Sequence, residues 1–233
     1  MNVFYVPNSV QDVVIQLDEN ESNHCVKVLR LRLNDEITLF DGNGGIHLAK
    51  IIDAHHKKCL VQTYQSSYTP KPEPHIHIAI APTKNIDRFE WFIEKAIEIG
   101  VGEITPLLCE KSERKQINDE RLEKVVVAAM KQSLNAYKTI LHPLTPFSQF
   151  VKNVKTPQKY IAHCEETGKR SLKELCKKKI DSLVLIGPEG DFSKSEIELA
   201  IQNSFQAVTL GTTRLRTETA GIVACHSIRF INE

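Results

Sequence analysis

The chain has few aromatic residues, no long apolar run and no excess of either charge. Of its 233 residues, 41% are hydrophobic and only 6% are aromatic, so the core must consist mainly of aliphatic side chains. No apolar stretch approaches the roughly 18 residues that a membrane-spanning helix needs. Thirty Lys and Arg residues against 29 Asp and Glu give a formal charge of +1. This balance excludes a tail-driven polycationic binder of nucleic acid, but it permits a local basic surface.

The six cysteines are too widely spaced for a disulfide framework or a structural zinc site. They stand at positions 25, 59, 109, 164, 176 and 225, without a Cys-x-x-Cys pair, and we expect reduced thiols and no bound metal. Three of them adjoin His24, His163 and His226, which we interpret as ordinary core or surface residues. The first ten residues, MNVFYVPNSV, lack the charged-then-apolar order of a secretory signal. Together these features predict a cytoplasmic protein that does not contact a membrane.

A proline-rich segment divides the chain. Pro70, Pro72 and Pro74 lack an amide donor and have a fixed φ, so neither a helix nor a central strand can continue through them. We place an N-terminal domain at residues 1–68 and a C-terminal domain at residues 75–233. Short alternating runs and a glycine-rich turn at 42–45 predict that the first domain is β-rich, with one short helix near 23–30.

The second domain alternates strand-like and helix-like segments. Strands are expected at 75–81, 103–109, 159–163, 182–186 and 207–210. Helices are expected at 87–99, with Asp87 and Glu90 at capping positions, and at 122–133, 197–203 and 219–231. Ser193 and Glu196 form a capping box before the helix at 197–203. A lysine-rich helix is also expected between the strand that ends at 163 and the strand that begins at 182. This alternation predicts an α/β domain with a mostly parallel sheet, whose ligands bind at the carboxyl ends of the strands.

Two loops that follow predicted strands carry unusual residues. The first, at 187–190, reads GPEG and is neither a dinucleotide-binding nor a Walker A loop; taken alone it favours a turn shaped only for folding. The second, at 210–221, concentrates two arginines, four threonines and a glutamate. Thr217 is a candidate cap of the last helix, but capping does not explain Arg216 beside it.

These loops resemble the closing motifs of a known family. GPEG, followed by LRTETA at 215–220, is similar to the RsmE family of 16S rRNA (uracil-N3)-methyltransferases, which belongs to the SPOUT superfamily. Upstream motifs at 24–31, 41–44, 95–106 and 132–133 extend the resemblance from about residue 24 to 226. It implies a SPOUT-type α/β domain with a deep trefoil knot at about 182–225, and a small β-rich PUA-like RNA-binding domain before it.

The chain departs from the family pattern at several positions. Asp191 stands where the family often has glycine, and Asn135 ends a segment in which the family has arginine. Thr213 stands where arginine is common, and Arg214 where the family has an aliphatic residue. The arginine missing at 135 removes an expected RNA contact, and Arg214 is a candidate to replace its positive charge.

The resemblance implies S-adenosyl-L-methionine as the cofactor, held in a bent form largely by backbone groups of the two loops. The residues that it assigns to the cofactor are Ile186, Gly187, Pro188, Glu189, Gly190, Leu210, Gly211, Leu215, Thr217 and Ala220.

Methylation of uracil N3 requires loss of the ring proton and stabilisation of the negative charge left on the ring. The guanidinium of Arg216 is expected to stabilise that charge on a uracil oxygen. Glu218 or Glu189 is expected to accept the proton or to orient Arg216. A partner of the helix dipole is a nearly equal interpretation of Glu218.

The resemblance also implies partners. RNA contacts are expected from Lys27, Arg30, Arg32, Lys111, Arg114 and Arg214. The expected substrate is 16S rRNA within the small ribosomal subunit. The final helix carries small and apolar residues on more than one stripe, which favours a homodimer. Two alternatives remain: a SPOUT enzyme acting on tRNA or 23S rRNA, and a non-catalytic RNA-binding protein of ribosome assembly.

Overall fold

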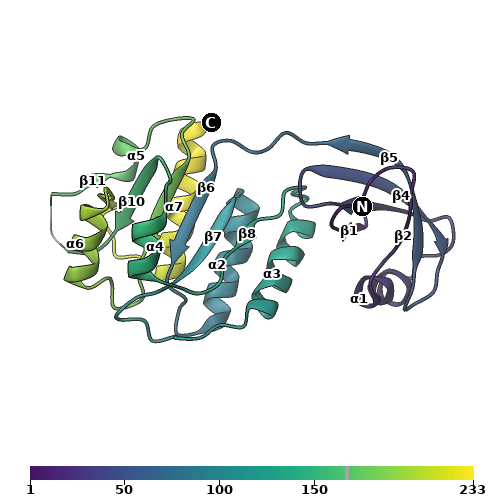
Figure 1. The fold of residues 1–233 in the computed structure, drawn as a ribbon, viewed down its shortest axis with the longest axis horizontal. Coiled ribbons are helices and arrows are strands. Elements are labelled where there is room, and N and C mark those ends of the chain that lie inside the picture. Colours follow the sequence, from purple (N-terminus) through teal and green to yellow (C-terminus); the bar gives the residue numbers. More distant parts are fainter. Residues whose placement is uncertain (166–167) are drawn as a thin grey trace. The chain divides into compact units, whose positions relative to one another are not determined.

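A computed structural model describes residues 1–165 and 168–233 of the chain, which forms two compact units (Figure 1). The first comprises residues 1–71 and 130–138, and the second comprises residues 72–129 and 139–233. Segment 130–138 therefore belongs to the first unit, whereas the sequence placed it in the second domain. The reason lies in contacts distant along the chain: Tyr137 pairs with Gly42 and Asn43, and the Lys131 ammonium lies 2.6 Å from the Glu21 carboxylate.

The first unit is built on a five-stranded sheet with the order β1-β3-β4-β5-β2. Its strands are β1 (Val3–Tyr5), β2 (Val14–Gln16), β3 (Glu36–Phe40), β4 (Gly45–Asp53) and β5 (Leu60–Tyr68). Strands β3, β4 and β5 form an antiparallel meander around a core that includes Phe4, Leu39 and Val61. The β-rich character predicted from the alternating runs is confirmed.

The short helix of the first unit begins earlier than the sequence predicted. Helix α1 (Glu19–Asn23) is capped by the Asp18 carboxylate, which accepts a hydrogen bond from the Glu21 amide. One π-helical turn, His24–Val28, continues it. Cys25 is buried, while Lys27 on the same turn is exposed.

The second unit is an α/β domain in which every strand pairing of the described residues is parallel. The sheet order is β11-β13-β10-β12-β6-β7-β8, with β9 beside β7. The strands are β6 (Ile76–Ile80), β7 (Glu103–Leu108), β8 (Ile140–Leu141), β9 (Thr145–Pro146), β10 (Gln158–Ala162), β11 (Arg170–Ser171), β12 (Ser182–Ile186) and β13 (Gln206–Thr209). The helices are α2 (Ile86–Ile99), α3 (Asp119–Gln132), α4 (Phe147–Asn153), α5 (Leu172–Leu175), α6 (Lys194–Gln202) and α7 (Thr217–Asn232).

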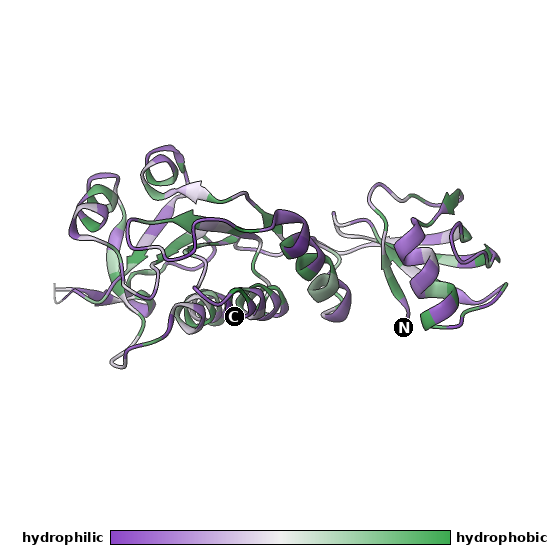
Figure 2. Cartoon of the chain, turned by 90° about the horizontal axis from the view of Figure 1, so that it is seen from below, coloured by the Kyte–Doolittle hydropathy of each residue, from purple (hydrophilic) through white to green (hydrophobic). Residues whose placement is uncertain are grey.

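The sheet of the second unit is covered on both faces. On one face Ile78 and Val184 pack with Phe92 of α2 and Ile228 of α7. On the other face the alternate strand residues pack against α4 and α6. Figure 2 shows the central strands as largely hydrophobic and the helices as carrying both kinds of residue, the pattern of a two-sided α/β core.

Several helix ends differ from the sequence predictions. The cap of α2 is Asn85, whose side chain accepts from the Asp87 amide, so Asp87 is not the capping residue. Helix α7 begins at Thr217, with Arg216 in the flanking position, so Thr217 does not cap it. The lysine-rich helix is only the four-residue α5, and α4 was not predicted. The capping box of Ser193 and Glu196 before α6 is confirmed.

Neither the helices nor the cysteines of the described residues suggest a membrane span or a disulfide. No helix among the described residues has the length and apolar character required to cross a membrane. All six cysteines are free thiols, and Cys164 alone among them is exposed.

Gly44→Ala should destabilise the first unit, because a Cβ at this position would lie 2.5 Å from the Tyr137 hydroxyl oxygen. Gly44 also has φ +96°, which side chains disfavour. We expect a loss of about 2 kcal/mol in the free energy of unfolding, measured by urea denaturation. In a Tyr137→Ala background the same substitution should cost only about 1 kcal/mol, since the steric part is removed. An equal cost in both backgrounds would contradict the role assigned to Tyr137.

Candidate functional site

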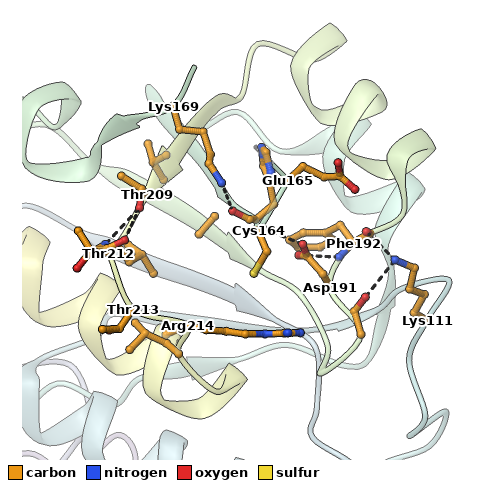
Figure 3. A pocket seen from close by; sticks show the side chains of 18 residues that line it. Lys111, Cys164, Glu165, Lys169, Asp191, Phe192, Thr209, Thr212, Thr213 and Arg214 are labelled. Atoms are coloured by element: carbon orange, nitrogen blue, oxygen red, sulfur yellow. Dashed lines mark hydrogen bonds between the residues drawn. The ribbon is translucent and has the colours of Figure 1, made fainter. Parts of the chain in front are cut away.

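Three loops converge at the carboxyl edge of the second unit's sheet. Strand β10 lies between β12 and β13, and its last residue, Ala162, is in register with Ile186 and Val208. The segments that follow these strands therefore start at the same level, where ligands of parallel sheets bind. Together with the start of α7 they surround a pocket of about 730 Å³, shown in Figure 3. The two loops singled out in the sequence both line it.

The GPEG loop is fixed by donors from three other segments. The Lys111 ammonium donates to the carbonyls of Gly190 and Phe192, at 3.0 and 3.1 Å. The Glu189 carboxylate accepts from the Lys84 amide at 2.8 Å. The Thr217 hydroxyl donates to the Gly187 carbonyl at 3.1 Å. The loop backbone is therefore held in one conformation before any ligand binds.

Asp191 explains one departure from the family pattern. Its φ is +61°, in the left-handed region that glycine adopts most easily. Its carboxylate accepts from the Phe192 amide and from the Cys164 amide, each at 2.8 Å. Asp191 thus combines the backbone conformation expected of glycine with a hydrogen bond that joins the loop after β12 to the loop after β10.

His163 is a candidate site residue that the sequence analysis dismissed. It lines the pocket of about 730 Å³ and is 7% exposed, and neither ring nitrogen has a hydrogen-bond partner among the described residues. Burial lowers the pKa of the His163 imidazole, and nearby Lys169 lowers it further. A neutral ring offers one donor and one acceptor to a ligand. The feature of the sequence that could have indicated His163 as a site residue is its position directly after a predicted strand, at the edge of the sheet where ligands bind.

A second pocket, of about 380 Å³, adjoins the first. The two share the lining residues Ala162, Cys164, Asp191, Arg214, Leu215 and Ala220. The smaller pocket also holds Arg216, which is exposed and whose guanidinium makes no hydrogen bond or ion pair with a described residue. A guanidinium without a protein partner is free to bind a ligand.

Glu218 pairs with a residue that the sequence analysis missed. Its carboxylate is 8% exposed, and its Oε1 lies 4.0 Å from Nε of Arg88 on α2. Both line the smaller pocket. Glu218 therefore lies near Arg88 on α2, and no local motif could have indicated a contact across 130 residues of sequence.

The predicted cofactor residues are divided between the two pockets. Those that line only the larger pocket are Gly190, Leu210 and Gly211. Those that line only the smaller pocket are Ile186, Gly187, Pro188, Glu189 and Thr217. Leu215 and Ala220 line both.

The predicted RNA-binding residues have different surroundings. Lys27, Arg30 and Arg32 are exposed on the first unit. Arg214 is exposed and lines both pockets, and Figure 3 shows it along one side of the larger one, with Lys111 near Phe192.

Arg114 and Asn135 are used inside the protein. The Arg114 guanidinium donates to the carbonyls of Thr83 and Lys84, at 3.0 and 2.6 Å, and so fixes the loop after β6. The Asn135 side chain accepts from the Tyr137 amide within a turn of the first unit. Lys111 likewise donates to carbonyls of the segment that begins with the GPEG loop. Contact of Lys111 and Arg114 with RNA stays a prediction.

The β-rich unit and the parallel α/β unit correspond to the two domains of a class of RNA methyltransferases. The profile of the RNA methyltransferase domain matches residues 69–229, and that of the RNA methyltransferase PUA domain matches residues 17–64. Ribosomal RNA small subunit methyltransferase E of Buchnera aphidicola subsp. Acyrthosiphon pisum is 33% identical over 91% of this chain and 85% of its own. This chain therefore belongs to the ribosomal RNA small subunit methyltransferase E family.

Solved structures agree with this assignment. A probable rRNA methyltransferase from Porphyromonas gingivalis is 39% identical, with a TM-score of 0.92 over 100% of this chain and 98% of its own. A ribosomal RNA small subunit methyltransferase E from Neisseria gonorrhoeae, bound to S-adenosyl methionine, is 26% identical, with a TM-score of 0.90 over 100% of this chain and 98% of its own. The α/β fold with a PUA domain, inferred from the motifs, is confirmed.

Substitutions at Asp191 should separate its backbone conformation from its hydrogen bonds. Asp191→Gly keeps the left-handed conformation and loses both bonds, at an expected cost of about 1–3 kcal/mol in the free energy of unfolding. Asp191→Ala should cost about 1–2 kcal/mol more, because a Cβ disfavours this conformation. Urea denaturation measures both, with Asp191→Asn as the control that retains an acceptor. A glycine variant less stable than the alanine variant would contradict this account.

Proposed function

We propose that this protein methylates N3 of a specific uridine in 16S rRNA of the small ribosomal subunit, with S-adenosyl-L-methionine as methyl donor. The observation that carries the proposal is the pair of adjoining pockets formed by the GPEG and LRTETA loops, in a chain of this family. One pocket suits the cofactor, and the other presents a free guanidinium and a carboxylate to a base. The structure from Neisseria gonorrhoeae, with its bound S-adenosyl methionine, supports the choice of cofactor.

The larger pocket has the properties that this cofactor requires. Its volume of about 730 Å³ lies within the roughly 300–1,000 Å³ typical of small-molecule sites. The unpartnered nitrogens of His163 suit the hydroxyl, amino or carboxylate groups of the cofactor, and loop backbone groups near Gly190, Leu210 and Gly211 suit its adenine. When bound, the cofactor supplies a methyl group on a positively charged sulfur. Leu215 and Ala220, which line both pockets, would lie near that methyl group.

The smaller pocket would receive the uracil. Arg216, exposed and without a protein partner, stabilises the negative charge that develops on a uracil oxygen as N3 loses its proton. Glu218 accepts that proton, and its ion pair with Arg88 holds the carboxylate in place. Glu189 is the weaker candidate for proton acceptor, because its Oε1 already accepts from the Lys84 amide. Alignment of N3 with the methyl group supplies the larger part of the rate, about 7–11 kcal/mol in well-oriented systems.

The first unit would bind RNA as a PUA-like domain. Lys27, Arg30 and Arg32 occur within seven exposed or part-exposed positions, 27–33, and the apolar side chains of Val28 and Leu33 among them are 61% and 57% exposed. Basic residues attract phosphates without regard to sequence, and neighbouring apolar groups suit unstacked bases. We assign the same role to Arg214 beside the pockets. We propose that the substrate is rRNA within the assembled small subunit and that the protein acts in the cytoplasm.

A trefoil knot at about 182–225 would explain how the pocket loops hold together. Strand β13 follows β12 in the chain but pairs with β10 on its far side, so the chain must cross β10 and return to form α7. The Thr217 hydroxyl then bonds back to Gly187. A knot fixes such a crossing by threading one loop through the other.

Arg216→Ala should abolish most methyl transfer without removing the cofactor. We expect turnover to fall about 10²–10³-fold, because a charge-stabilising donor is lost, while affinity for S-adenosyl-L-methionine changes less than about tenfold. Arg170→Ala is the matched control, since Arg170 is exposed and pairs with Glu174 outside both pockets. Mass spectrometry of rRNA and tRNA nucleosides from a deletion strain complemented with each variant is the test. The proposal fails if 16S rRNA retains N3-methyluridine in the deletion strain, or if Arg216→Ala restores it normally.

The protein should form a homodimer through α7. Phe230 on this helix is 63% exposed and its ring stacks on His226, which leaves an apolar surface for a partner. Light scattering should give about twice the 26.4 kDa of one chain. Phe230→Glu should shift the protein toward the monomer, whereas Val10→Glu, at a 51% exposed apolar residue of the first unit, should not. A monomeric mass for the unmodified chain at micromolar concentration would overturn the dimer.

A further inference from the structure

A cluster of histidines and one glutamate lies at the opposite edge of the second unit's sheet from the pockets. His77 is near the start of β6, Glu103 is the first residue of β7, and His142 follows β8. His77 and Glu103 are directly in register, and the His142 amide donates to the Ile104 carbonyl. The proposed methyl transfer uses none of these residues.

The donor atoms of the cluster are close enough to share an ion. One donor atom from each of His77, Glu103 and His142 lies within 4.8 Å of the other two. His77 Nδ1 is 3.7 Å from Glu103 Oε2, and His142 Nε2 contacts Glu103 Oε1. Across residues 1–165 and 168–233, no other group of three or more His, Cys, Asp or Glu residues brings its donors together in this way.

We propose that His77, Glu103 and His142 bind one Zn²⁺ ion, with water completing the coordination. Two imidazole nitrogens and one carboxylate oxygen form a zinc ligand set, with metal–ligand distances of about 2.0–2.2 Å. Mg²⁺ is disfavoured because it prefers an all-oxygen site. Cysteine spacing alone predicted no metal site. His77, Glu103 and His142 are far apart in the sequence and are brought together only by the pairing of strands.

Groups around the cluster orient its members as zinc ligands. His77 Nε2 lies 2.8 Å from the Thr105 hydroxyl, and both residues are buried. If Nε2 carries the ring proton and donates it to Thr105, then Nδ1 is left to bind the metal, which is the usual arrangement of ligand histidines. His75 Nε2 lies 3.0 Å from Glu103 Oε2 and so fixes the carboxylate. Gly102 makes room for His75, because a Cβ there would lie 2.5 Å from the ring.

The cluster lies at the end of the sheet away from the pockets, so the proposed ion takes no part in methyl transfer. The ion would join β6, β7 and the segment after β8, while the glycine loops lie at the other ends of the strands. Bound zinc should therefore stabilise the second unit and leave the affinity for S-adenosyl-L-methionine unchanged.

The test is calorimetric titration of the full-length chain with Zn²⁺, after chelator treatment and removal of the chelator. We expect one equivalent to bind and to raise the midpoint of thermal unfolding. His142→Ala removes a ligand that is 38% exposed, so the variant should fold and lose this binding. Thr105→Val keeps the volume of the side chain and should weaken binding about 10–100-fold, the usual cost of losing a partner of a ligand histidine.

Two control variants test whether other groups of the chain account for the zinc binding. His55→Ala/His56→Ala removes a stacked histidine pair of the first unit, and Cys164→Ser removes the exposed thiol. Neither should change the stoichiometric binding, and a cobalt(II) complex should lack a thiolate charge-transfer band. Absence of stoichiometric binding, binding that persists in His142→Ala, or binding lost in either control would overturn the proposal. The cluster would then be a carboxylate–histidine hydrogen-bond network without metal.

Discussion

Parallel pairing of β12, β10 and β13 in register is the constraint on which the candidate site depends. Ala162, Ile186 and Val208 lie side by side, so three segments distant in sequence leave the sheet at one level. Only then can the backbone of one loop reach the side chains of another. A slip by one residue would turn every strand side chain to the opposite face and break the packing of both cores.

Several charged side chains in this region hold loop backbone in place. Lys111 donates to a carbonyl of the GPEG loop, and Arg114 donates to a carbonyl of the loop after β6. Asp191 accepts from amides of the loops after β12 and β10. Charge-assisted hydrogen bonds are stronger than neutral ones and hold loops rigidly. Among the site arginines, Arg214 and Arg216 keep their side-chain donors free of described partners, unlike Arg88 and Arg114, and so remain available to a ligand. Burial of His163 without partners points to a ligand for the same reason, since unsatisfied buried polar groups are costly.

The two edges of one sheet carry different chemistry. The carboxyl edge gathers glycine loops, because exposed amides and small residues permit a ligand to approach the backbone. The amino edge gathers histidines and Glu103 because β6, β7 and β8 start beside one another. Because the proposed catalytic site and the proposed ion site lie at opposite edges of the sheet, the residues of one site can change without disturbing the other.

Local patterns in the sequence determined a large part of this protein. Helical spacing, the Ser193 capping box and the alternation of strands and helices indicated the α/β unit, because these features depend on neighbours in the chain. The GPEG and LRTETA strings indicated the loops of the pocket, because unusual residues in a strand-to-helix connection need a reason beyond folding. Tertiary structure alone decided which distant residues meet. Arg88 reaches Glu218, residues 130–138 join the first unit, and Asp191 supplies both a left-handed turn and a hydrogen bond. These outcomes depend on strand order and loop crossing, which set distances between residues far apart in sequence and leave no mark in the local pattern.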